Sequence, residues 1–120
     1  MAEELAAGRL TSAGCRVLAR NARVRYAELA IAGELDLVVL EGRTLVFVEV
    51  KAGRAGAAIG PSRPVLAVDP RKQQRLRRLA RAWIATEAAP WYEAIRFDVI
   101  GVTVHRGGVP PELEWIRDAF

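Results

Sequence analysis

The segment that most constrains the fold is GELDLVVLEGRTLVFVEVK, residues 33–51. Two runs rich in apolar residues, 34–40 and 44–51, flank Glu41-Gly42, and glycine there permits the tight turn of a β-hairpin. We therefore expect two adjacent, largely buried strands. The same runs carry four charged residues: Glu34, Asp36, Glu49 and Lys51. Charged side chains are rarely buried without a partner, so their presence in these strands requires an explanation.

Whether these four side chains meet depends on the register of the hairpin, because side chains alternate between the faces of a strand. A two-residue loop at Glu41-Gly42 places Glu34 opposite Glu49. A four-residue loop places Asp36 opposite Glu49 and Glu34 opposite Lys51. Both registers put all four residues on one face, whereas a three-residue loop without a bulge splits them between the faces. The turn chemistry of Glu41-Gly42 favours the two-residue loop.

Carboxylates gathered in this way repel one another and need a compensating cation. Lys51 supplies one positive charge, and carboxylate oxygens also suit Mg²⁺, which can activate a water and stabilise charge on a phosphoryl oxygen. A lysine whose pKa is lowered by the metal and by partial desolvation would orient or deprotonate that water. The alternative is a cross-strand salt bridge on a solvated face, which would contribute little to stability. Leu45 and Phe47 share the face of Glu49, which argues against a fully solvated face.

The remaining chain predicts one α/β domain over residues 1–120, with a mixed central sheet flanked by helices. Residues 23–32 fit either an extension of a strand or an excursion from it, and we leave both open. The other expected elements are a helix at 2–13, strands at 15–20 and 95–104, a mobile loop at 52–68, a helix from 69 to about 89 and a short strand within 113–120.

Composition points to a reducing compartment and an anionic partner. Cys15 is the single cysteine, so no intramolecular disulfide or Cys-based zinc cluster can form. No apolar run reaches the length of about 18 residues that a membrane span needs, and the acidic N-terminus is unlike a signal peptide. We therefore expect a cytoplasmic protein with no membrane association. The net charge is +4, from sixteen arginines and only two lysines, Lys51 and Lys72. Where arginine is the usual cation, a lysine indicates a compact ammonium with a tunable pKa.

The basic charge concentrates in the helix that begins at Asp69, where an N-cap acid precedes a proline. An apolar stripe that includes Leu76, Leu79 and Trp83 should face the sheet and leave the basic side in solvent. We expect that side to bind the DNA backbone without reading base sequence, and the alternative is an arginine-rich face that is merely solvated. The predicted DNA-binding residues are Arg71, Lys72, Arg75 and Arg78. Asp98 has Arg96 two residues away on the same face, which favours a structural ion pair over a metal ligand.

Several stretches resemble one known family. They are AEELAAGRL, VLARN, GELDLVVLEGRTLVFVEVK, AVDPRKQQRLRRLA, RFDVIGV and WIRDAF. Together they are similar to the UPF0102 (YraN-like) family, which is thought to be nuclease-like and related to archaeal Holliday junction resolvases in the PD-(D/E)-x-K superfamily. The resemblance implies a restriction-endonuclease-like fold. This chain departs from the family pattern by an insertion around Tyr26 to Ala32 and by Ala52-Gly53 in place of basic residues.

The resemblance also implies a function and a set of site residues. It implies a metal-dependent endonuclease that acts on DNA, with branched or junction DNA as the favoured substrate. Asp36 and Glu49 would bind Mg²⁺ or Mn²⁺, Glu3 would supplement them, and Lys51 would be catalytic. A homodimer would be needed to cut two strands symmetrically. Two alternatives remain open, a DNA-binding protein with a degenerate site and an interaction protein with an incidentally basic surface.

Overall fold

The structure is a computed structural model that describes residues 1–56, 63–87 and 89–120. Within those residues the chain forms two α-helices, five strands and two 3-10 turns. In order they are α1 (Ala2–Ser12), β1 (Arg16–Tyr26), η1 (Ala27–Leu29), β2 (Ile31–Glu41), β3 (Thr44–Arg54), η2 (Pro64–Ala67), α2 (Pro70–Thr86), β4 (Ala94–Val104) and β5 (Glu112–Ile116). The expected mobile loop at 52–68 is shortened at both ends, by β3 and by η2, and residues 57–62 lie outside the described part. Neither described helix is both long and apolar enough to cross a bilayer.

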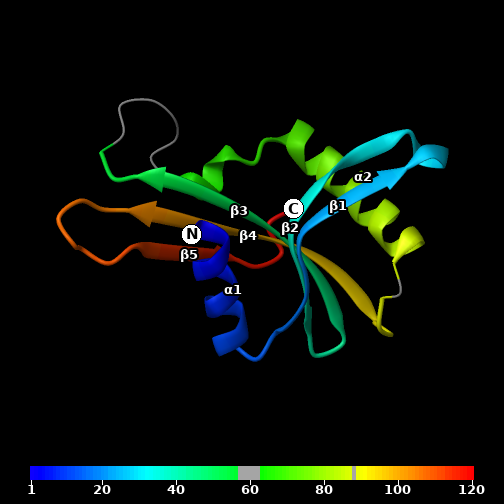
Figure 1. Ribbon diagram of the computed structural model, residues 1–120, viewed down its shortest axis with the longest axis horizontal. Coiled ribbons are helices and arrows are strands. Elements are labelled where there is room, and N and C mark those ends of the chain that lie inside the picture. Colours follow the sequence, from blue (N-terminus) through cyan, green and yellow to red (C-terminus); the bar gives the residue numbers. More distant parts are fainter. Residues whose placement is uncertain (57–62, 88) are drawn as a thin grey trace.

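The five strands form one mixed sheet in sequential order. β3 and β4 run parallel, and the connection between them carries α2, whereas every other neighbouring pair is antiparallel. α1 packs on one face against Val46, Val48 and Ile100, and α2 packs on the opposite face (Figure 1). The α/β prediction is therefore confirmed, and the arrangement is compatible with a restriction-endonuclease-like fold.

Helix α2 forms as its sequence predicts. The Asp69 side chain caps the helix by accepting a hydrogen bond from the backbone N–H of Lys72 at 2.9 Å, and Pro70 occupies the first turn. Leu76, Leu79 and Trp83 are buried against the sheet. The Trp83 ring meets Phe47 edge to face, with 5.8 Å between ring centroids. This packing turns the basic side of α2 away from the core.

The β2–β3 hairpin has a register different from the favoured one. Glu41 pairs with Thr44, so the turn is Gly42-Arg43 rather than Glu41-Gly42. Gly42 supplies the positive φ of 60° that the turn needs. Glu41 remains in the strand because its carboxylate accepts hydrogen bonds from Arg96 at 2.8 Å and Arg117 at 3.2 Å. The register is therefore the one expected for the four-residue loop.

The β1–β2 hairpin extends beyond the rest of the sheet. Of the two alternatives for residues 23–32, a strand extension or an excursion, it is therefore mainly an extension. The last β2–β3 pair is Leu37 with Val48, whereas β1 and β2 remain paired as far as Tyr26 and Ile31. We call residues 22–35 the arm. It is an extension of both strands, closed by η1, and it lies along α2 (Figure 1).

Two arginines of α2 fasten the arm. Arg75 donates a hydrogen bond to the Ala32 carbonyl at 2.6 Å, and Arg78 donates one to the Leu29 carbonyl at 3.0 Å. Beneath these contacts Val24 is buried in the same apolar cluster as Leu79. The inner face of the arm is therefore part of the core.

Gly33 lies where the ends of two α2 side chains reach the arm. A β-carbon there would lie 2.8 Å from Arg75 Nη2 and 3.0 Å from a methyl group of Leu79. We expect Gly33→Ala to lower the free energy of unfolding by about 1–3 kcal/mol in urea titrations, because the Arg75 guanidinium, which bonds the Ala32 carbonyl, and the buried Leu79 side chain must shift. The matched control is Gly8→Ala on α1, where a β-carbon would meet no atom of the described residues within 4 Å beyond its own helix backbone and chain neighbours, and alanine should add about 0.5–1 kcal/mol. Equal effects of the two substitutions would contradict tight packing at Gly33.

Candidate functional site

Asp36, Glu49 and Lys51 come together where β2 leaves β3, and we call them the carboxylate site. Beyond the pair Leu37 and Val48 the strands separate, and the Asp36 side chain reaches across to accept the backbone N–H of Val50 at 2.8 Å. Lys51 Nζ lies 3.5 Å from Glu49 Oε1. The Asp36 carboxylate also lies close enough to Glu49 to raise the pKa of its carboxyl group. The structure thus gathers the three residues that the sequence singles out.

The carboxylate site is not a solvated ion pair. The side chains of Glu49 and Lys51 are only 14% and 20% exposed. Leu45 and Phe47, which alternate with Glu49 along β3, are buried on the face covered by α2. The alternative of a weak salt bridge on a wet face is therefore wrong, and charges here interact more strongly than at the surface.

Glu49 is unusually easy to protonate. Burial raises its pKa to about 7, and the charge of Asp36 and the hydrogen bond with it act in the same direction, while Lys51 opposes them. Two neighbouring carboxylates cannot both ionise without cost. A proton or an additional cation would therefore stabilise the pair at neutral pH.

Without a bound ion, the pKa of Lys51 is raised. Burial lowers it, but the neighbouring carboxylates of Glu49 and Asp36 raise it, so the pKa lies above its ordinary value. Lys51 is therefore held as an ammonium that can donate hydrogen bonds. This charge state suits orientation of a water or a phosphoryl oxygen better than removal of a proton.

Lys72 is a member of the site that the sequence did not place there. It enters from the first turn of α2, and contact with the Lys51 ammonium lowers the pKa of Lys72, with burial adding to the effect. The two lysines of the chain are therefore neighbours in space. Their rarity among sixteen arginines was the available signal, but it gave no reason to place them together.

Two acidic residues lie apart from this group. Among the described residues, no three His, Cys, Asp or Glu side chains are grouped closely enough to hold a metal ion, so Glu3 on α1 does not join Asp36 and Glu49. Glu34 lies in the arm opposite Arg23, not opposite Lys51, because β2 and β3 no longer pair there. Two carboxylates still fit Mg²⁺, which commonly takes one or two carboxylates and completes its shell with waters and substrate phosphates.

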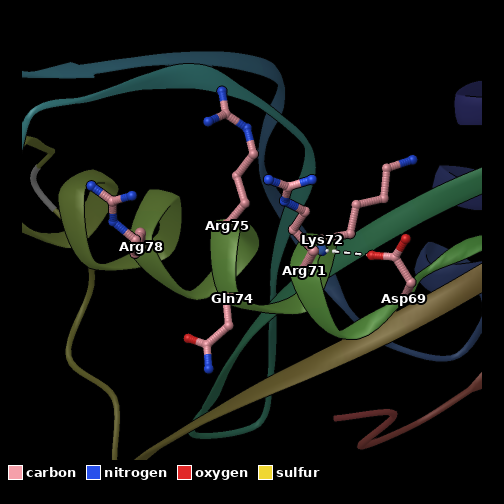
Figure 2. A pocket seen from close by; sticks show the side chains of 6 residues that line it. All are labelled: Asp69, Arg71, Lys72, Gln74, Arg75 and Arg78. Carbon is pink, nitrogen blue, oxygen red and sulfur yellow. Dashed lines mark hydrogen bonds between the residues drawn. The ribbon is translucent and has the colours of Figure 1, made fainter.

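The basic side of α2 forms a hollow of about 540 Å³ (Figure 2). Lys72 lies both in its lining and beside Lys51 of the carboxylate site. Its lining residues are Asp69, Arg71, Lys72, Gln74, Arg75 and Arg78. All four predicted DNA-binding residues are among them. Arg75 and Arg78 each give one hydrogen bond to the arm, and since a guanidinium has five N–H donors, both retain donors for a ligand.

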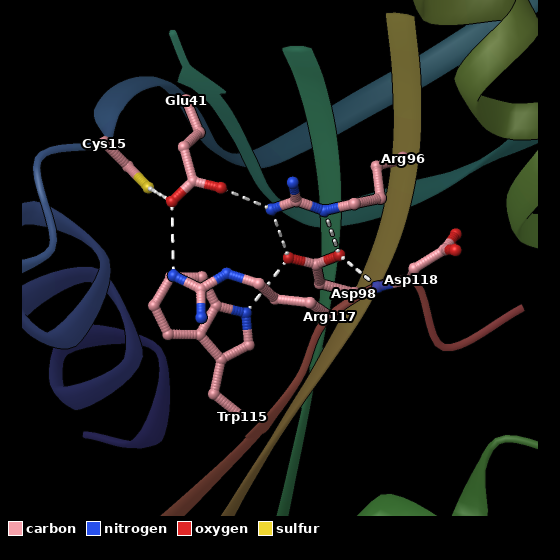
Figure 3. Close-up of polar contacts among 7 residues, drawn as sticks. All are labelled: Cys15, Glu41, Arg96, Asp98, Trp115, Arg117 and Asp118. Atoms are coloured by element: carbon pink, nitrogen blue, oxygen red, sulfur yellow. Dashed lines mark hydrogen bonds and ion pairs between the residues drawn. The ribbon is translucent and has the colours of Figure 1, made fainter.

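A second polar cluster lies on the opposite, α1 side of the sheet and is structural (Figure 3). Asp98 is 0% exposed and accepts hydrogen bonds from Arg96 Nε at 2.8 Å and Nη2 at 3.0 Å. Trp115 Nε1 at 3.0 Å and the backbone N–H of Asp118 at 2.9 Å complete its partners. These contacts attach the C-terminal segment to β4, and they confirm the prediction of a structural Arg96–Asp98 pair.

Glu49→Gln should make stability less dependent on pH. The pKa of Glu49 rises from an ordinary 4.5 to about 7 on folding, so folding favours the protonated form and stability falls as pH rises through this interval. Glutamine resembles the protonated form. In urea titrations without divalent ions, we expect Glu49→Gln to stabilise the chain at pH 8.5 and to change little at pH 5. Exposed Glu4 on α1 provides a control, and an equal change for Glu4→Gln and Glu49→Gln at both pH values would contradict this account.

Comparison of the sequence with known proteins places the chain in a family. The family model described as "Uncharacterised protein family UPF0102" matches residues 2–102, which include the whole carboxylate site and Lys72. A UPF0102 protein of Solibacter usitatus is 44% identical over 118 residues, covering 98% of this chain and 81% of the relative. UPF0102 proteins of Acidothermus cellulolyticus and Pseudomonas aeruginosa are 42% and 41% identical, cover 98% and 99% of this chain, and are themselves covered to 89% and 88%. The chain therefore belongs to the UPF0102 family.

Proposed function

We propose that this protein is a metal-dependent endonuclease that hydrolyses phosphodiester bonds of DNA at the carboxylate site. The observation that carries the proposal is the convergence of Asp36 and Glu49 with Lys51, beside a helix whose exposed side is basic. A buried pair of carboxylates is costly unless a cation is bound, and a basic surface beside it attracts a polyanion. Together these features favour a reaction at phosphate.

Each residue has a role in this proposal. Asp36 and Glu49 would hold Mg²⁺ or Mn²⁺, and such an ion, when bound, supplies Lewis acidity and lowers the pKa of its water. Lys51 would donate a hydrogen bond to the attacking water or to a phosphoryl oxygen, while Lys72 neutralises a neighbouring phosphate. In the net reaction the water oxygen bonds to phosphorus and one P–O ester bond breaks. The proton released by the water ends on the leaving oxygen.

The substrate class rests on charge and on the family relationship suggested by the sequence motifs. Arg71, Lys72, Arg75 and Arg78 offer contacts to phosphates and no visible device for reading bases, so binding should follow the shape of the backbone. Branched or junction DNA is the favoured substrate by resemblance to resolvases. Symmetrical cutting of two strands would then require a homodimer.

A DNA-binding protein without turnover is the second candidate. It is favoured by the grouping of only two carboxylates among the described residues, one of which already accepts a backbone hydrogen bond. In that case the metal site is degenerate, and the basic side of α2 alone accounts for function.

A substrate panel tests the proposal. We expect the purified protein to cut junction, flap or linear duplex DNA only when Mn²⁺ or Mg²⁺ is added, and Lys51→Ala to cut more slowly by about 10²-fold. The control variant is Arg106→Gln, which removes an exposed cation from the turn between β4 and β5. If wild type and Lys51→Ala give the same products in every lane, with and without metal, the nuclease proposal is wrong.

A further inference from the structure

We call the side of the arm that faces away from α2 its outer face. It carries two arginines that do not belong to the basic side of α2. Arg23 and Arg25 are exposed on β1 and flank Val24, which is buried against α2. Because side chains alternate along a strand, the two arginines face away from the helix. Within the described residues, neither forms an ion pair or a side-chain hydrogen bond. The arm is fastened by Arg75 and Arg78 instead, so Arg23 and Arg25 are not needed to hold it.

These arginines border a hollow of about 430 Å³. It is lined by Arg23, Val24, Arg25, Ala32, Gly33 and Glu34. Arg25 pairs across the hairpin with Ala32, a small residue that leaves room beside the guanidinium. Glu34 stands opposite Arg23 and offsets part of its charge. The net charge around the hollow is positive, which suits a phosphate group.

Strand β2 runs from the arm into the carboxylate site. Ala32 and Glu34 precede Asp36 at alternate positions of β2. At a rise of about 3.3 Å per residue, Ala32 is about 13 Å from Asp36 along the strand. A DNA duplex presents one phosphate per strand about every 3.4 Å of its axis. A duplex bound at the site would therefore offer several phosphates within reach of the arm.

We propose that the outer face of the arm, centred on Arg23 and Arg25, is a second phosphate-binding surface for the DNA bound at the carboxylate site. This inference rests on the proposed function, because the same DNA occupies both places. The basic side of α2 and the outer face of the arm would bind different stretches of backbone. A branched substrate, whose duplexes leave the branch point in different directions, would contact both surfaces. The inference therefore favours branched DNA over a short linear duplex.

The double variant Arg23→Gln/Arg25→Gln tests the inference through binding alone. The matched control, Arg16→Gln/Arg106→Gln, removes the same charge from exposed positions outside the arm. DNA affinity is measured by fluorescence anisotropy in EDTA over a range of salt concentrations, with a four-way junction and a short duplex. Each lost phosphate contact reduces the slope of log affinity against log salt by about 0.9. We therefore expect a reduction of about 1.8 for the arm variant on the junction, and a smaller effect for the control.

Thermal unfolding separates a binding effect from damage to the fold, and both double variants should unfold at the wild-type temperature because all four side chains are exposed. Equal salt slopes for the arm variant and the control would overturn the inference even if wild type cleaves DNA. A selective loss in the arm variant would support it even if wild type proves unable to cleave, in which case only the hydrolytic proposal fails. Salt-insensitive DNA binding by wild type would overturn both.

Discussion

Replacing Asp36 by asparagine is expected to reduce DNA cleavage by about 1,000-fold or more and to leave DNA affinity within about twofold. Asparagine has nearly the shape of aspartate and keeps an oxygen that can accept the Val50 N–H, but it loses the charge that would hold a divalent ion. Metal ions contribute several kcal/mol to transition-state stabilisation, and each 1.36 kcal/mol is about tenfold in rate. Cleavage is measured under single-turnover conditions with saturating Mn²⁺, and affinity by anisotropy in EDTA.

The two readouts of Asp36→Asn separate the competing functions. Loss of cleavage with retained binding supports an enzyme. Unchanged cleavage by the variant would show that the carboxylate site is not where hydrolysis occurs. Binding without metal-dependent cleavage in wild type would favour the DNA-binding protein with a degenerate site.

Asp98→Ala is expected to lower the free energy of unfolding by about 3–5 kcal/mol, measured by urea titration. The substitution leaves the Arg96 guanidinium with Glu41 as its remaining acidic partner. It also removes the acceptor for Trp115 Nε1 and for the backbone N–H of Asp118, and buried donors without partners are costly. The free energy of unfolding of a small domain is only about 5–15 kcal/mol, so a loss of this size is a large share of the total.

The control for Asp98→Ala is Asp118→Asn. Asp118 contributes its backbone N–H to the cluster, and its positive φ of 52° is tolerated by asparagine. We expect a change within about 0.5 kcal/mol for this control. If Asp98→Ala is no more destabilising than Asp118→Asn, the buried cluster does not have the structural role assigned to it.

The local signals in the sequence were sufficient for the two helices, for the central part of most strands and for the central residues of the site. They did not predict the 3-10 turns or the full lengths of β1 and β3. Asp69-Pro70 and the apolar stripe define α2, and the alternation in 44–51 puts Glu49 and Lys51 on one face. The Arg96–Asp98 pair was also predictable, because residues two apart in a strand share a face. Each of these predictions depends on residues close together in the chain.

What the sequence did not predict depends on contacts between distant segments. The hairpin register follows from Arg96 and Arg117, which are 55 and 76 residues from Glu41. The arm is determined by arginines of α2, and the meeting of Lys72 with Lys51 requires that α2 cross this end of the sheet. Glu34 was expected opposite a residue of β3, but β2 and β3 no longer pair at that position. An alternating pattern does not reveal where two strands separate.

Titration calorimetry with Mn²⁺ at pH 8 tests most directly whether Asp36 and Glu49 form a cation site. Wild type should bind one ion per chain with a saturable isotherm, and both Asp36→Asn and Glu49→Gln should weaken binding by at least about tenfold, because oxygen ligands with full charge are lost. The Arg106→Gln control should bind as wild type does. No saturable binding by wild type, or the same affinity in all four proteins, would contradict the account.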